Sequence, residues 1–156
     1  MANTRSRWIV ICCVLAIALW PNRARPVESD QLLATVNKPA TVTARVPSSE
    51  GATEKLPPRA RVIISVTNYR PTDDGTPVEV VVKGRTGDGE EREVGRFGIT
   101  PDREFNAAEP SGALRFNLAL PQELTTKEPV KFSIHLVPNK GQGKGATLRV
   151  GSVEIR

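Results

Sequence analysis

The sequence predicts an all-β protein, a single antiparallel β-sandwich of about seven strands with at most one short helix. Three observations favour this fold class. Beyond residue 40, apolar and polar residues alternate with a period of two through most of the chain. The 13 prolines and 12 glycines divide this pattern into short stretches, as turns between strands do. Aromatic residues make up 4% of the 156 residues, so valine, leucine and isoleucine must supply most of the core of one modest domain.

Seven stretches carry the strand pattern: residues 41–46, 60–68, 77–84, 92–99, 113–120, 130–137 and 146–155. The clearest are 113–120 and 130–137, where every second residue is large and apolar. In the last stretch the phase slips, because Leu148 and Val150 are even-numbered while Val153 and Ile155 are odd-numbered. A one-residue slip turns a strand's core face outward unless a β-bulge absorbs it, so we predict a bulge at Gly151-Ser152. The one helical candidate is residues 121–128, at most two turns.

The N-terminal stretch MANTRSRWIVICCVLAIALWPNRARP indicates export. A short basic region precedes the 13 apolar residues 8–20, and a proline follows them. Thirteen helical residues span about 20 Å, which is short for a hydrocarbon core. We therefore predict residues 1–24 as a signal peptide, or as an uncleaved N-terminal membrane anchor, and residues 25–156 as the single β-sandwich domain. The predicted location is secreted, periplasmic or in the cell envelope, with membrane contact only through residues 8–20 if they are retained.

Both cysteines, Cys12 and Cys13, lie inside this apolar run. No Leu-x-small-Cys pattern ends the run, which favours small hydrophobic residues of a leader over lipid attachment. The domain beyond the leader then has no cysteine, so it has neither a disulfide framework nor a thiolate metal site.

The net charge of +5 falls to about +2 without the leader, which has three arginines and no acidic residue in its first 24 positions. Acidic and basic residues are interspersed over the remainder, which favours a mixed-charge surface and gives no indication of nucleic-acid binding.

No set of residues in the sequence predicts catalysis. His135 is the sole histidine and falls on the polar face of its strand, where a solvated side chain is favoured over a metal ligand. The acidic stretches at Asp73-Asp74 and at residues 88–93 could bind calcium, but they do not match a calcium loop and lie in predicted turns. Tyr69 could face a ligand or pack its ring at the rim of the sandwich. We predict no enzymatic activity, no metal and no cofactor.

The C-terminal strands resemble a known family. The stretch ALRFNLALPQEL…VKFSIHLVPNKGQGKGATLRVGSVEI is similar to the C-terminal domain of polyphenol oxidases, the tyrosinase and catechol oxidase group. The positions that carry this resemblance are Leu136, Val137, Pro138, Val150, Gly151, Val153 and Ile155. The match continues more thinly upstream and covers roughly residues 32–156, but the K-F-D-V signature of the family is missing, and so is its six-histidine di-copper domain.

In that family the domain is a sandwich-like cap over the copper entrance. The resemblance therefore implies an exported, non-catalytic domain that shields or assists a separate copper oxidase as its partner. The alternative is a generic exported β-sandwich for adhesion, scaffolding or ligand binding, because sandwiches host many unrelated functions.

The glycine-rich stretch VPNKGQGKGATL, residues 137–148, could cradle a phosphate or form a turn. A phosphate loop places its glycines at the start of a helix, whereas the residues that follow here alternate as a strand. We therefore predict a hairpin connection on which Lys140 and Lys144 are solvated charges.

Overall fold

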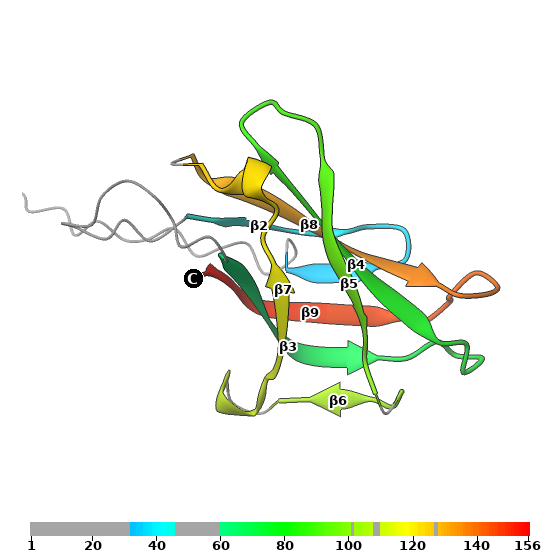
Figure 1. The fold of residues 1–156 in the computed structure, drawn as a ribbon. Helices are drawn as coiled ribbons and strands as arrows, with labels where there is room; N and C mark the ends of the chain where they lie inside the picture. Colours follow the sequence, from blue (N-terminus) through cyan, green and yellow to red (C-terminus); the bar gives the residue numbers. More distant parts are fainter. Residues whose placement is uncertain (1–31, 46–59, 101, 108–109, 127) are drawn as a thin grey trace, which may run out of the picture.

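The computed structural model describes residues 32–45, 60–100, 102–107, 110–126 and 128–156. The predicted leader, residues 1–24, and the polar segment 47–59 lie outside these ranges. The described residues form nine strands and two 3-10 helices, and the strands make two antiparallel sheets packed face to face (Figure 1). The prediction of an all-β sandwich is confirmed.

The first sheet has the order β1-β9-β3, and β3 pairs along its other edge with both β7 and β6. Its strands are β1 (Leu33–Thr35), β9 (Thr147–Ile155), β3 (Arg61–Arg70), β7 (Leu114–Ala119) and β6 (Phe105–Asn106). β3 has ten residues and is rich in valine and isoleucine, which suit the half-buried surface of a pleated strand. It therefore lies between two neighbours and carries most of the pairing in this sheet.

The second sheet has the order β2-β8-β4-β5. Its strands are β2 (Ala40–Ala44), β8 (Val130–Pro138), β4 (Val78–Thr86) and β5 (Arg92–Gly98). Each of the seven predicted stretches overlaps one of the nine strands, with ends that differ by no more than two residues where the strand extends beyond the stretch. The two strands that were not predicted, β1 and β6, have three and two residues, too few to show an alternation.

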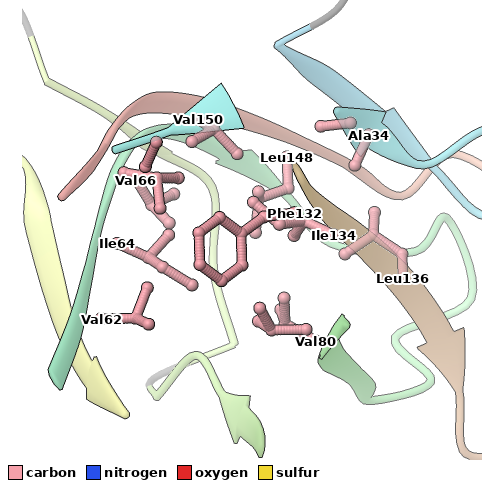
Figure 2. Close-up of a cluster of buried hydrophobic side chains, with 14 of the residues drawn as sticks. Ala34, Val62, Ile64, Val66, Val80, Phe132, Ile134, Leu136, Leu148 and Val150 are labelled. Atoms are coloured by element: carbon pink, nitrogen blue, oxygen red, sulfur yellow. The ribbon is translucent and has the colours of Figure 1, made fainter. Parts of the chain in front are cut away.

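The core lies between the two sheets and is built from their inward-facing residues. In the first sheet these include Val62, Ile64 and Val66 of β3, all fully buried. Phe132 of β8 lies at the centre of the cluster, between Ile64 of one sheet and Val80 of the other (Figure 2). Valine, isoleucine and leucine supply most of the remaining side chains, as the composition predicts.

An aromatic pair joins the two sheets where the edge strands β5 and β7 meet. Phe97 of β5 and Phe116 of β7 stack with ring centroids 3.8 Å apart and an interplanar angle of 14°. Gly95 lies beside them, and a β-carbon there would contact Leu118 of β7 at 3.2 Å. This side of the sandwich is therefore closed by side chains across the edge strands.

The predicted bulge is present in β9. Ser152 pairs with Ser65 of β3, but the next pair joins Val66 to Val150, so Gly151 is left out of the ladder. As a result, Val150 and Val153 both face the core although their numbers differ in parity. A β-carbon on Gly151 would lie 2.6 Å from Cγ2 of Thr67, which explains a glycine at this position.

The predicted helix in residues 121–128 is a single 3-10 turn, η2 (Gln122–Leu124). Its Leu124 is buried, and a β-carbon on Gly84 of β4 would lie 2.9 Å from the Leu124 side chain. A second 3-10 turn, η1 (Pro110–Gly112), was not predicted.

Candidate functional site

The glycine-rich segment between β8 and β9 is the most elaborate loop among the described residues. Gly141, Gly143 and Gly145 all have positive φ, of 67°, 62° and 87°. Glycine adopts this region without steric cost, so three glycines in alternate positions allow a compact path that other residues would resist. The residues that follow form strand β9 rather than a helix, as predicted.

The prediction of a hairpin is wrong, because β8 belongs to the second sheet and β9 to the first. The segment crosses from one layer of the sandwich to the other. Alternation along β8 and β9 cannot reveal this, since both strands bury one face whether they pair with each other or not.

Close packing holds the segment in place. A β-carbon on Gly143 would lie 2.9 Å from both Pro138 and Val36 side-chain atoms, and one on Gly145 would clash with the Asp73 carboxylate. The Asp73 N–H donates to the Lys144 carbonyl at 2.8 Å, and the Asn139 N–H donates to the carbonyl of Pro77 at 3.0 Å. Gly143 and Gly145 are therefore required for two reasons: neighbouring residues leave no room for a side chain, and the φ angles are positive.

The neighbouring acidic turn, residues 71–77, has its own internal hydrogen bonds. The Asp74 Oδ1 accepts from the Thr76 N–H at 3.0 Å, and the Thr72 hydroxyl donates to the Thr76 carbonyl at 2.8 Å. The bond from the Thr76 N–H is the main cause that lowers the pKa of Asp74 below its ordinary value. Within the part of the chain that the structure describes, no three histidine, cysteine, aspartate or glutamate side chains could together hold a metal ion. Asp74 therefore acts as a turn residue.

An open hollow of about 690 Å³ lies against the glycine-rich segment. We call it the loop hollow, and residues from four parts of the chain line it: Thr35, Val36, Asn37, Arg70, Pro138, Gly141 to Thr147. Its volume falls in the range of ligand sites, although such sites are commonly more apolar. Arg70 is an ion-pair partner of Asp73, with Nη2 3.1 Å from Oδ1. Among the described residues, the free polar side chains of the hollow include Lys144, Gln142, Asn37 and Thr147.

Lys144 and the glycines of this hollow belong to the stretch noted in the sequence, whereas Thr35, Asn37 and Arg70 were not predicted as part of a site. Residues 35–37 and Arg70 lie far in the chain from the glycine-rich segment and carry no motif. Only the crossing of the glycine-rich segment between the layers brings them together.

Tyr69 packs inside the sandwich. It is 1% exposed, and its hydroxyl donates to Oδ1 of Asp102 at 2.6 Å. Burial is the main cause that raises the pKa of Tyr69 above its ordinary range, and the hydrogen bond and negative charge of Asp102 add to it. Of the two interpretations from the sequence, ring packing is the correct one.

His135 differs from the prediction of a solvated side chain. It is half-buried, and its Nε2 is buried without a hydrogen-bond partner among the described residues. Val81 pairs with it across β4 and β8 and is itself 6% exposed on the same outer face, so this part of the face is more closed than alternation along β8 predicts.

The seven residues that carry the family resemblance do not gather into a site. Leu136, Val150, Val153 and Ile155 lie in the core, and Gly151 forms the bulge. Val137 is 42% exposed on the outer face of β8, and Pro138 ends that strand beside Gly143. These residues build the end of the sandwich and the start of the loop hollow.

Comparison of the chain with protein-family models and with curated proteins gives no match. The resemblance to the polyphenol oxidase C-terminal domain therefore stays a prediction. No helix among the described residues is long and apolar enough to cross a membrane. The predicted signal or anchor, residues 1–24, lies outside those residues.

Proposed function

We propose that this protein is a non-catalytic β-sandwich domain that binds a separate copper oxidase of the tyrosinase and catechol oxidase group and covers the entrance to its copper site. The ordered resemblance of strands β7, β8 and β9 to the cap domain of that group supports the choice of partner. The observation that carries the proposal is the loop hollow, a preformed depression at one end of the sandwich.

The loop hollow suits a docking role because its walls are fixed before any partner arrives. Three glycines with positive φ and hydrogen bonds to the acidic turn hold the glycine-rich segment against the body of the domain. Binding then costs little loop ordering, which is one of the main terms that weaken protein association. A protruding segment of the oxidase would enter the hollow and hydrogen-bond to Gln142, Lys144 and Asn37.

The experiment measures binding and latency together. The purified protein is titrated against a copper-loaded tyrosinase-type oxidase, with calorimetry for affinity and diphenol oxidation for activity. We expect saturable binding and a lower oxidation rate in the complex. The absence of both would overturn the proposal.

A matched pair of variants locates the contact. Gln142→Trp places a large side chain in the loop hollow, and we expect it to weaken binding about tenfold or more. Asn117→Trp introduces the same side chain at an exposed position of β7, away from the hollow, and should leave binding unchanged. Equal effects of the two variants would contradict docking at the hollow.

A further inference from the structure

The outer face of the first sheet carries a second candidate surface, independent of the loop hollow. We call it the arginine face, and paired positions on neighbouring strands define it because they point to the same side. Its residues are Arg61, Ile63, Ser65 and Asn68 of β3; Arg115, Asn117 and Ala119 of β7; and Arg149, Gly151, Ser152 and Glu154 of β9, followed by Arg156. None of these residues is fully buried, so the surface is open.

Three of its arginines have no carboxylate partner among the described residues. Arg61, Arg115 and Arg149 are exposed and take part in none of the ion pairs of that part of the chain. Arg156, by contrast, is neutralised by Glu154, with Nη2 2.8 Å from Oε2. Glu154 is the one acidic residue of the face, so the face as a whole is cationic.

The spacing of these arginines favours an extended ligand. Arg115 pairs with Ser65 and Arg149 with Asn68, while Arg61 lies four residues before Ser65 on β3. Strand rise and strand separation place Arg115 about 10–15 Å from each of the other two arginines and Arg61 about 20–25 Å from Arg149, all beyond the Debye length at physiological salt. A small anion would contact one of them, whereas a polyanion can contact all three in turn.

The other side chains of the face indicate the kind of polyanion. No described residue of the face is aromatic, so stacking on sugar rings or on unpaired bases has no platform there. Its large apolar side chains are the half-buried Ile63 and, beside Arg149 on β1, the half-buried Leu33, and neither is the aromatic anchor that protein interfaces favour. Ser65, Ser152 and Asn117 between the arginines offer hydroxyl and amide groups suited to sugar hydroxyls.

We propose that the arginine face binds an acidic polysaccharide, a sugar polymer that carries carboxylate or sulfate groups. The guanidinium fork donates two parallel hydrogen bonds to either group, which a lysine cannot do, and all the basic residues of the face are arginines. The neighbouring hydroxyl and amide side chains hydrogen-bond to the sugar between its charged groups.

The test measures polysaccharide binding by the whole chain, with no oxidase present. Calorimetry at about 0.15 M salt compares polygalacturonate, a carboxylated polymer, heparin, a sulfated polymer, and neutral dextran, with duplex DNA as the competing class of polyanion. We expect binding to at least one acidic polysaccharide, none to dextran, and weaker binding to DNA. The two acidic polymers distinguish the carboxylate from the sulfate source of the charge.

Two triple variants, each of which removes three positive charges, distinguish polysaccharide binding at the arginine face from a general effect of net charge. One carries Arg61→Ser, Arg115→Ser and Arg149→Ser. The other carries Lys83→Ser, Arg85→Ser and Lys131→Ser on the outer face of the second sheet, where Arg85 pairs with Lys131 and Lys83 with Ser133. We expect the first to weaken binding about tenfold and the second less than about twofold.

Further variants separate a loss of binding from a loss of folding and from oxidase docking. Single Arg115→Ser and Arg149→Ser proteins, checked for an unchanged melting temperature, should each show part of the loss. Gln142→Trp in the loop hollow should leave polysaccharide binding intact, so this proposal can fail or succeed apart from oxidase docking. Equal losses in the two triple variants, no binding of the original protein to either polymer, or tighter binding to DNA would each overturn the proposal.

Discussion

The outer faces of the two sheets differ in the ion pairs that their charged side chains form. On the outer face of the first sheet, Arg61, Arg115 and Arg149 have no acidic partner among the described residues, and no residue of the arginine face is fully buried. On the second sheet, Arg96 of β5 bonds to Glu93 at 2.7 Å and to Glu79 of β4 at 3.1 Å. Arg96 is therefore neutralised within the second face, although Lys83, Arg85 and Lys131 of that face form no ion pair among the described residues. The first face differs in having one acidic residue, Glu154, whose partner is Arg156, so Arg61, Arg115 and Arg149 stay available to a ligand.

The second face also buries side chains that point away from the core. Val81 and Ser133 are each 6% exposed although they lie on the outer side of β4 and β8. The Ser133 hydroxyl donates a hydrogen bond to Oε1 of Glu91 at 2.7 Å. Arg96 of β5 is the register partner of Val81 of β4. Polar side chains thus cover part of this face, and its buried residues contribute to stability.

The largest effect that tests this contrast is expected at Val81. Val81→Ala removes two buried methyl groups and should lower the free energy of unfolding by about 1.5 kcal/mol. Val137→Ala makes the same change on the same outer face at a position that is 42% exposed, and should cost less than about 0.5 kcal/mol. Urea denaturation of both variants gives the comparison. Equal losses would show that the side chains around Val81 do not shelter it.

A smaller effect is expected at Ser133. Ser133→Ala removes the hydrogen bond to Glu91 and should cost about 1 kcal/mol. Ser65→Ala on the arginine face is the control, because Ser65 is half-buried and its hydroxyl bonds to no described residue, so its loss should be close to zero. Urea denaturation of both variants gives the comparison. If the dependence of the unfolding free energy on urea concentration is unchanged, the shifts in midpoint report the two losses of stability directly. A loss at Ser65 as large as that at Ser133 would mean that the first face is also structured by its polar groups.

Much of the sandwich could be predicted because its strands obey one simple rule. Every second residue of β7 and β8 is apolar, and the break of that rule at Gly151 correctly located the bulge. Alternation reports on one strand at a time, however. It cannot tell which strands share a sheet, and for that reason the crossing of the glycine-rich segment was predicted as a hairpin.

Neither candidate surface could be predicted from the sequence, for the same reason. The chain beyond the leader is nearly neutral, with its basic and acidic residues interspersed, so a mixed-charge surface was the natural prediction. The pairing of the strands then determines which charges meet: Glu79 and Glu93 fall on the second sheet beside basic residues such as Lys83, while Arg115 and Arg149 fall outward on the first. The loop hollow likewise depends on residues 35–37, 70 and 138–147 meeting in space.

The smallest effect is expected for the ion pairs of Arg96, which are about half-exposed. Arg96→Gln should lower the melting temperature slightly at low salt, and the difference should shrink toward about 0.5 M salt because exposed ion pairs are screened. Arg149→Gln on the arginine face has no such partner among the described residues, so it should not lower the melting temperature at either salt concentration. A salt-dependent loss at Arg149 would contradict the contrast between the faces.

The pH dependence of the Arg96 effect follows from its partner. The hydrogen bond from Arg96 is the main cause that lowers the pKa of Glu93 below its ordinary value of 4.5. A lowered pKa in the folded state means that the carboxylate contributes stability above pH 4.5, and that this contribution is lost as the pH falls through the folded value. The melting-temperature difference between Arg96→Gln and the original protein should therefore be constant near neutral pH and disappear in acid. A difference that persists at pH values well below 4.5 would mean that Arg96 acts by packing its stem over Val81 rather than by its charge.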